Sequence, residues 1–298
     1  MITTRNRCEE LQRTLEKLFD LQPPADEVII CADGCTDGTP AMVRQQFPSC
    51  ILLENEFARG SVFSRDRLLR AASGDIVASF DDDSYPLEKD FFARVEQLFA
   101  EHDDAAVISF PEVRDEEEAA HANKTASSPP HLVSAYANCA AAVRRDVYLR
   151  SQGFPFFFTH MYEEPDYALQ CYSLGYVVRF EPSLRVRHRV SSAQRKPIRR
   201  HHLNARNELY SVFMRCPFPQ LIAVALFRIW RQFRYACNEG FPWAIREPLW
   251  WCSALLDVPN CIRHRRPIDW PTYYVWMKRA RHSMALVHEP TSVAQASA

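Results

Sequence analysis

The chain has 298 residues, of which 47% are hydrophobic, and its formal net charge is -1. This length and apolar content support a buried core and exclude a disordered chain, while the balanced charge excludes a molecule that binds polyanions over its whole surface. Ten cysteines occur singly, with no CxxC pair. We therefore expect neither a zinc site nor a disulfide framework, and predict reduced, mostly buried thiols.

The N-terminus lacks the charged and then apolar pattern of a signal peptide. No segment reaches the roughly 20 consecutive apolar residues that span a bilayer. We expect a cytoplasmic protein, either soluble or peripheral at the inner face of the membrane.

Strand and helix patterns alternate along the first part of the chain. The apolar start, residues 1–4, is typical of the end of a strand, and we expect the usual upstream strand residues to be missing. Apolar runs predict strands at 28–31, 51–53, 76–80, 107–110, 140–143 and 177–180. Helical spacing or capping predicts helices near 11–18, 39–47, 64–72, 87–100, 144–152 and 164–174. This α/β alternation predicts a mainly parallel, Rossmann-like sheet flanked by helices.

Residues 112–130 are rich first in acids and then in Ala, Ser and Pro. This texture predicts a long solvated loop, with an active-site lid as the alternative. Beyond about residue 201 the pattern is helical, with aromatic residues interleaved with arginines. We expect a catalytic domain over residues 1–210 and a C-terminal helical extension over residues 211–298.

The acidic triplet Asp81, Asp82 and Asp83 directly follows an apolar run. Ligands of a parallel sheet bind at the carboxyl ends of its strands. Adjacent carboxylates repel one another unless a cation or hydrogen bonds compensate, and oxygen ligands favour Mg²⁺ or Mn²⁺. The triplet therefore predicts a metal site beside phosphates, with a solvated acidic turn as the alternative.

Two further segments place polar residues where helices begin. Residues 32–39 carry glycines that permit close backbone approach and precede the free amides of a helix, although a capped turn also explains them. Residues 162–167 place Glu164 and Asp166 in the first turn of a helix that accepts Pro165. Capping by the helix dipole is one interpretation. The functional one is that Glu164, with Asp166 in reserve, takes a proton from an acceptor hydroxyl.

His188 lies in a basic stretch, residues 185–206, which has eight Arg or Lys and no Asp or Glu. A structural histidine is the plain interpretation, but basic surroundings suit a diphosphate. The stretch carries no recognition-helix, zinc-finger or RNA-binding signature. We therefore expect no nucleic acid as a partner.

The ordered set of motifs resembles the family 2 glycosyltransferases of GT-A fold, over residues 1 to about 210. The resemblance is carried by Thr3-Thr4-Arg5-Asn6-Arg7, Asp33-Gly34-Cys35-Thr36-Asp37-Gly38-Thr39, Gly74-Asp75 with the acidic triplet, Glu163-Glu164-Pro165-Asp166, and His188. It implies an inverting, metal-dependent transfer of a sugar from a nucleotide-diphosphate donor, with Glu164 as base. It also implies nucleotide-sugar contacts from Thr4, Arg5, Asp33, Arg65, Asp81 and Asp82, and binding of Mn²⁺ or Mg²⁺ by Asp81, Asp83 and His188.

The resemblance leaves the partners open. Ala32 stands where the family usually has an acid that contacts the nucleotide base. The resemblance therefore does not specify the base, and the implied donor is a UDP-, GDP- or dTDP-sugar. The implied acceptor is a saccharide or lipid-linked hydroxyl, as in synthesis of cell-surface polysaccharide or glycoconjugate. The helices after Pro217 suit a membrane surface, a dimer contact or ordinary core. The competing functions are nucleotidyl transfer, which usually begins with a glycine-rich phosphate loop not visible here, and a degenerate nucleotide-sugar-binding module.

Overall fold

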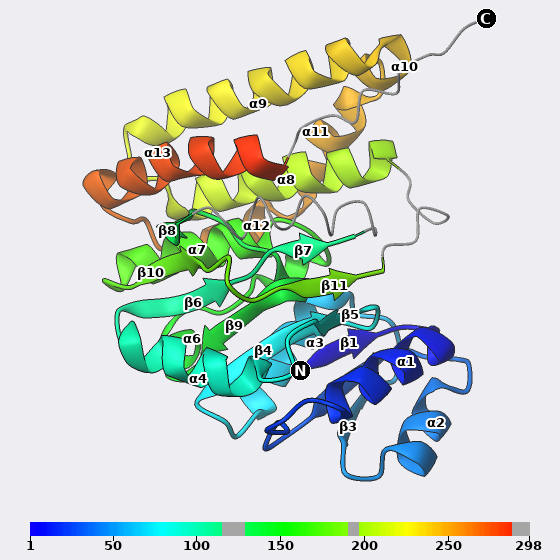
Figure 1. Ribbon diagram of the computed structural model, residues 1–298. Helices are drawn as coiled ribbons and strands as arrows, with labels where there is room; N and C mark the ends of the chain where they lie inside the picture. The colour runs from blue at the N-terminus through cyan, green and yellow to red at the C-terminus, as the bar shows by residue number, and fades with distance from the viewer. Residues whose placement is uncertain (115–128, 190–196, 288–298) are drawn as a thin grey trace, which may run out of the picture.

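The computed structural model describes residues 1–114, 129–189 and 197–287. Its centre is an eight-stranded sheet in the order β3-β2-β1-β4-β9-β6-β10-β8 (Figure 1). The strands are β1 (Ile2–Thr4), β2 (Ile29–Asp33), β3 (Ile51–Asn55), β4 (Ile76–Asp81), β6 (Ala105–Ser109), β8 (His131–Leu132), β9 (Ala141–Arg144) and β10 (Val177–Phe180). The mixed α/β architecture predicted from the sequence is confirmed.

The helices of the sheet region follow the predicted alternation closely. They are α1 (Cys8–Phe19), α2 (Thr39–Gln46), α3 (Ser61–Ala71), α4 (Phe91–Glu101), α6 (Arg145–Arg150) and α7 (Glu163–Ser173), with short 3-10 turns at Asn138–Ala140 and Phe156–Phe158. Helix α2 begins where Thr39 and Pro40 indicated, and Asp37 Oδ1 accepts a hydrogen bond from the Thr39 amide at 3.0 Å. Asp37 therefore satisfies one of the free amides at this helix start.

The direction of strand β9 was not predicted from the sequence. Strands β1 to β4 pair in parallel, as do β6 and β10, but β9 runs antiparallel to both β4 and β6. The apolar run that predicted β9 fixes a buried strand but not its direction. The sheet is thus two parallel groups joined through the antiparallel β9, and β8 at the edge is antiparallel to β10.

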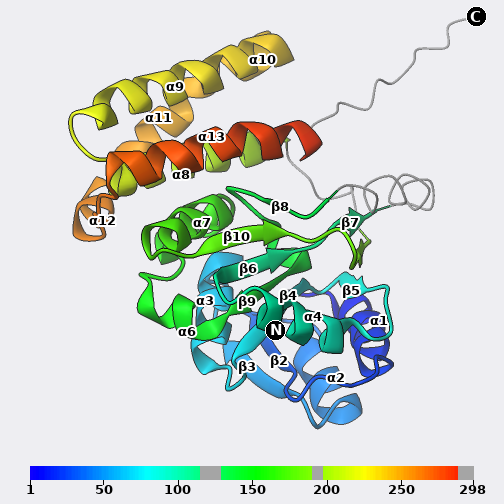
Figure 2. The same cartoon turned by 60° about the vertical axis from the view of Figure 1, so that its left-hand side comes forward.

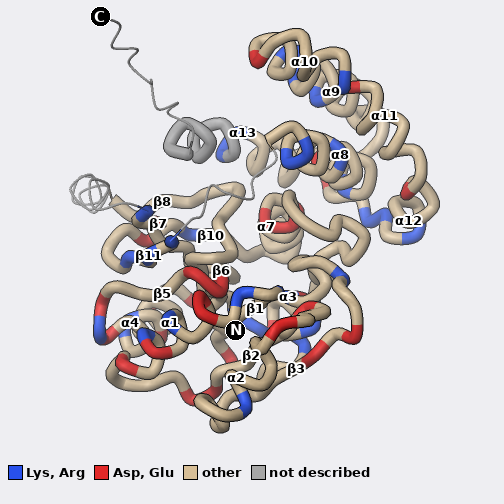
Figure 3. The backbone as a smooth tube through the Cα atoms, turned by 90° about the vertical axis from the view of Figure 1, so that its right-hand side faces the viewer, with Lys and Arg blue, Asp and Glu red and all other residues tan. Residues whose placement is uncertain are grey.

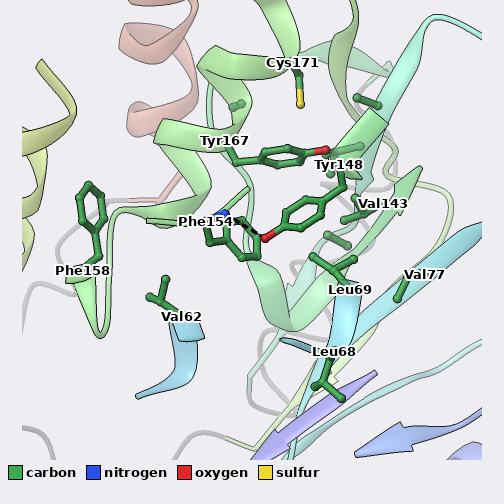
Figure 4. Packing of buried hydrophobic residues seen from close by; sticks show 14 of the residues in the cluster. Val62, Leu68, Leu69, Val77, Val143, Tyr148, Phe154, Phe158, Tyr167 and Cys171 are labelled. Atoms are coloured by element: carbon green, nitrogen blue, oxygen red, sulfur yellow. Dashed lines mark hydrogen bonds between the residues drawn. The ribbon is translucent and has the colours of Figure 1, made fainter. Parts of the chain in front are cut away.

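The core has two halves, one on each face of the sheet. Alternate residues of β2 divide between them, because Ile29 and Cys31 contact one hydrophobic cluster and Ile30 the other. Figure 4 shows part of the first half, where the rings of Tyr148 and Tyr167 pack closely and the Tyr148 hydroxyl accepts the Phe154 amide at 2.9 Å. Helices on both faces therefore hold the strand ends in fixed positions.

A second, three-stranded sheet consists of β5 (Ser84–Pro86), β11 (Val186–His188) and β7 (Glu112–Val113). Strand β11 lies between the other two, antiparallel to β5 and parallel to β7. In the register His188 is opposite Ser84, the residue that directly follows the acidic triplet. This small sheet brings together three segments that are far apart in the sequence.

The C-terminal helices stack on the α7 and β10 side of the sheet domain, away from α1 and α2 (Figures 1 and 2). They are α8 (Pro197–Arg215), α9 (Gln220–Glu239), α10 (Phe241–Ala244), α11 (Glu247–Leu256), α12 (Val258–Arg263) and α13 (Trp270–Val287). The boundary expected at residue 210 falls inside α8. Within residues 1–114, 129–189 and 197–287, none of the helices has the length and apolar character that crossing a bilayer requires.

All ten cysteines are free. Cys31, Cys139, Cys171, Cys216 and Cys261 are buried, whereas Cys237 and Cys252 are exposed. Burial of the thiols is therefore less general than the sequence suggested.

Candidate active site

The acidic triplet lies at the carboxyl end of β4, where the sequence placed it. Asp81 is the last residue of β4, and Asp82 and Asp83 form the turn into β5. Asp82 and Asp83 are only 5% and 4% exposed. They are not a solvated acidic turn, so their charges need compensation within the protein.

Arg7, which precedes α1, compensates two of the three acids. Its guanidinium nitrogens lie 2.9 Å from Asp82 Oδ1 and 2.8 Å from Asp83 Oδ2. Asp82 also accepts the Thr4 hydroxyl at 2.9 Å. Burial nevertheless raises the pKa of Asp82 to about 7, so this carboxyl is protonated more easily than an ordinary one. Thr4 and Asp82, both predicted to contact the nucleotide, thus bond to each other.

His188 joins the triplet through the small sheet. Its Nε2 lies 3.2 Å from Asp83 Oδ1, and its Nδ1 lies 2.7 Å from Glu112 Oε2 on β7. Burial lowers the pKa of His188, but the hydrogen bonds to Asp83 and Glu112 outweigh this and raise it to about 9. Burial raises the pKa of Glu112, yet its bonds to His188 and the charge of Arg114 bring it to about 2. Without a metal, His188 is therefore an imidazolium held between two carboxylates.

The donors around His188 fit a divalent cation. One ligand atom each from Asp81, Cys139 and His188 lie within 4.8 Å of one another. Proteins orient a metal-binding histidine by a bond from its other ring nitrogen to a carboxylate, which is the relation of His188 Nδ1 to Glu112. Nε2 can face a cation once it loses its proton. The mixed oxygen, nitrogen and sulfur donors suit Mg²⁺ poorly, because Mg²⁺ prefers oxygen.

Arg65 on α3 connects the triplet to the start of α7. Its two terminal nitrogens donate to Asp81 Oδ1 at 2.5 Å and to Glu163 Oε1 at 2.8 Å. Arg65 is 6% exposed and Glu163 is 1% exposed. This buried bridge brings the acidic motif of α7 to the end of β4, so the two carboxylate motifs meet at one edge of the sheet.

Glu164, the residue after this bridge, is half-buried. Burial, together with the charge of Glu163, raises the pKa of Glu164 to about 8, although Arg65 acts against the shift. A carboxyl with a pKa near neutrality can exchange protons at working pH, which is the property of a general base.

The chain before α7 is held in an unusual conformation. Thr159, Met161 and Tyr162 have φ of 61°, 73° and 70°. Asn207 of α8 donates to the carbonyls of Phe158, His160 and Met161 at 3.2, 2.9 and 2.8 Å, which fixes this segment. Strained backbone persists only where its surroundings determine it, and it clusters at functional sites. Helix α8 therefore positions the start of α7.

Asp166, the reserve candidate for the base, is buried and bound by residues of α7 and α8. It is 0% exposed, and its oxygens accept from Ser211 Oγ at 2.8 Å, Gln170 Nε2 at 2.8 Å and Arg215 Nη2 at 2.9 Å. These donors from α7 and α8 occupy both carboxylate oxygens. Asp166 therefore anchors α7 to α8, and these bonds favour Glu164 over Asp166 as the candidate base.

The remaining predicted nucleotide contacts are placed as follows. Asp33 ends β2 and accepts the backbone amides of Arg59 and Gly60 at 2.8 and 2.9 Å, so it holds the loop before α3. Gly60 has φ 94°, and a Cβ there would lie 2.4 Å from the Thr159 carbonyl oxygen. This close approach ties the Asp33 loop to the segment before α7. The Arg5 side chain is exposed.

Four residues of the cluster were not predicted as site residues: Arg7, Glu112, Cys139 and Glu163. Arg7 and Glu163 belong to motifs that the sequence singled out, so their neighbourhood was the available signal. Glu112 begins an acid-rich stretch, and Cys139 is one of ten scattered cysteines. Neither of these two carries a local pattern that distinguishes it.

The family comparison agrees with this geometry. The sequence profile of Glycosyl transferase family 2 matches residues 1–165. The chain belongs to this family and has a GT-A glycosyltransferase fold. No curated protein sequence matches it in the comparison. Membership of the family supports glycosyl transfer as the activity.

Solved structures show the same fold at low sequence identity. A mannosyltransferase from Pyrobaculum calidifontis in complex with GDP-Man and Mn²⁺ aligns with a TM-score of 0.58 and 20% identity, covering 96% of this chain and 84% of that one. S. aureus TarS 1-349 in complex with UDP gives 0.59 and 15%, covering 84% and 76%. GalNAc-T7 with UDP, GalNAc and Mn²⁺ gives 0.62 and 12%, covering 97% and 57%.

Proposed function

We propose that this chain transfers a sugar from a nucleotide-diphosphate donor to an acceptor hydroxyl with inversion at the anomeric carbon. The observation that carries the proposal is the Arg65 bridge, which brings the acidic start of α7 to Asp81 and the triplet. The proposed base and the proposed diphosphate site thereby share one edge of the sheet. Family membership supports the reaction class.

Glu164 is the base in this proposal. Its carboxylate takes the proton of the acceptor hydroxyl while the acceptor oxygen forms a bond to the anomeric carbon. The bond from that carbon to the diphosphate oxygen breaks on the opposite face, and the nucleoside diphosphate leaves. The half-buried cation Arg7 and the buried cation Arg65 hold the carboxylates in place and add positive charge beside the leaving group.

Asp81, Asp83 and His188 would hold a divalent ion, and Cys139 is a further donor within reach. When bound, such an ion supplies positive charge to the departing diphosphate. We favour Mn²⁺ over Mg²⁺ because imidazole and thiol are poor Mg²⁺ ligands. Two of the structural neighbours were solved with Mn²⁺, which is consistent with this choice.

Two variants test the assignment of roles. Glu164→Gln is expected to retain donor binding while its kcat falls, since the amide cannot take a proton. Asp83→Ala is expected to lose cation-dependent turnover. Glu96→Gln changes an exposed carboxylate of α4 and serves as the control. An active Glu164→Gln enzyme would reassign the base.

A donor screen separates the competing functions. UDP-, GDP- and dTDP-sugars, each with and without Mn²⁺, are added to the full chain and the shift of Tm is recorded. One donor class is expected to raise Tm more with Mn²⁺ than without it. Release of nucleoside diphosphate from the donor indicates glycosyl transfer, and binding without turnover indicates a degenerate module. A separate arm contains a nucleoside triphosphate and a sugar 1-phosphate, from which release of pyrophosphate indicates nucleotidyl transfer. We expect saccharide or lipid-linked acceptors, as in glycoconjugate synthesis.

A further inference from the structure

A pocket lies outside the carboxylate cluster, between α8 and α11. Its volume is about 680 Å³. This size falls in the range of roughly 300 to 1,000 Å³ that is usual for sites that hold a small organic ligand. The proposed transfer reaction assigns no role to it.

The walls of this α8–α11 pocket are largely apolar. Ile198 and Leu203 come from α8, and Leu249 and Trp250 come from α11. Trp250 is 2% exposed, and its Nε1 donates to Glu247 Oε2 at 2.8 Å, so the back wall is fixed. Leu249 lines the pocket but is 63% exposed, which leaves apolar surface at the mouth.

The same pocket carries positive charge and no acid. Arg199, Arg206 and Arg246 line it, and among the described residues that line it none is Asp or Glu. Arg199 and Arg246 are exposed, and in the part of the chain that the structure describes neither forms an ion pair. Arg206 donates only to neutral oxygens, those of Asn207 and Phe158. Figure 3 shows basic residues gathered along α8.

Glu247, the nearest acid in the sequence, does not neutralise these arginines. It is 0% exposed, and its carboxylate is taken by His201 Nε2 and Trp250 Nε1, both at 2.8 Å. The guanidinium groups at the mouth are therefore available to an anion from outside. Their planar donor geometry matches phosphate oxygens.

The apolar surface continues from the pocket along α11. Leu256 lies two turns beyond Leu249 on the same helix face and is 79% exposed, and Ile245, next to Arg246, is 61% exposed. A hydrocarbon chain that leaves the pocket at Leu249 would therefore find further apolar contacts and not a polar rim. Contiguous exposed apolar surface of this kind marks binding sites.

We propose that the α8–α11 pocket binds an amphiphilic anion, a phosphate group joined to a hydrocarbon chain. The phosphate lies between Arg199 and Arg246, and the chain lies against Leu249 and Trp250. Arg206, which also lines the pocket, and Asn207 bond to the segment before α7, so α8 links the pocket to the helix that carries Glu164. The inference does not depend on the proposed transfer, because binding can be measured without donor or cation.

Calorimetric titration of the full chain with octyl phosphate, inorganic phosphate and 1-octanol tests the proposal. We expect octyl phosphate to bind at least about tenfold more tightly than either fragment, because both chain and charge contribute. Arg246→Gln is expected to weaken octyl phosphate binding by about tenfold, since one charge-assisted hydrogen bond is lost. Leu249→Ala is expected to weaken octyl phosphate but not inorganic phosphate.

Arg263→Gln is the matched control, because Arg263 is exposed on α12 and does not line the pocket. Three results would each overturn the proposal. In the first two, octyl phosphate binds no more tightly than 1-octanol or no more tightly than inorganic phosphate. In the third, Arg246→Gln leaves the affinity for octyl phosphate unchanged. Vesicles of phosphatidic acid and of phosphatidylcholine identify the source of the lipid. Arg246-dependent binding to phosphatidic acid vesicles alone supports a bilayer phospholipid as the ligand. Arg246-dependent binding to octyl phosphate, with neither kind of vesicle bound, supports a single lipid phosphate molecule as the ligand.

Discussion

Replacing Asp166 with Asn separates a stabilising carboxylate from a catalytic one. The substitution removes the negative charge that faces Arg215, a side chain 2% exposed, and disturbs bonds from Ser211 and Gln170. Breaking a buried ion pair by removing one partner costs about 3 to 5 kcal/mol, because the remaining charge is left without compensation. At roughly 2 °C per kcal/mol for a chain of this size, Tm should fall by roughly 6 to 10 °C.

The assay combines calorimetry with kinetics below the lowered Tm. Asp166→Asn is expected to keep a kcat close to that of the wild type, because Asp166 is separate from the acidic triplet. The double variant Asp166→Asn with Arg215→Met should lose less stability than the sum of the two single variants, since it leaves no unpaired charge. The control Glu96→Gln should change stability by less than about 0.5 kcal/mol. A kcat about 100-fold lower at unchanged Tm would refute the reasoning and return Asp166 to the reaction.

Four further outcomes follow from the structure. Because the pKa of Glu164 is about 8 and the base acts when deprotonated, kcat should rise with pH and level off above about 8; a flat pH profile contradicts this. Because His188 must lose a proton to face a cation, Mn²⁺ binding should release protons and tighten as pH rises toward about 9, measured by titration in buffers of different ionisation enthalpy. In the metal-free protein the stability contributed by the same histidine is present below its ordinary pKa of 6.5 and is lost as pH rises through about 9. Gly60→Ala should lower the free energy of unfolding by about 1 to 3 kcal/mol, because φ is 94° and the new Cβ would lie 2.4 Å from the Thr159 oxygen. In the control Gly74→Ala the nearest atom is 3.6 Å from the new Cβ, so the free energy of unfolding should change by less than about 1 kcal/mol.

The α/β class and most element positions could be predicted because apolar runs and helical spacing are local properties. Residues 177–180 were predicted as a strand and form β10 with the same bounds. The direction of β9 could not be predicted, because a short apolar run is the same in either direction. Strands β5 and β7, of three and two residues, are too short to carry an alternation pattern.

Residues of the candidate site were predicted where a motif follows a strand. They were missed where residues distant in the sequence come into contact only in the folded chain. The acidic triplet could be located because its strand is readable. Glu112 of β7 and Cys139 in the turn before β9 contact His188 only in the folded chain, and no sequence pattern indicated the second sheet. Glu164 and Asp166 share the first turn of α7, and only the packing of α8 against that helix distinguishes their environments.

The order in which the three-stranded sheet closes has a consequence for synthesis of the protein. Strand β11 is the middle strand, and it comes about a hundred residues after β5 in the chain. Until the ribosome has released residues up to 188, the outer strands have no partner between them and the histidine is absent. A nascent chain that already carries the acidic triplet therefore lacks this imidazole, so the cluster of carboxylates and histidine is completed only late in translation.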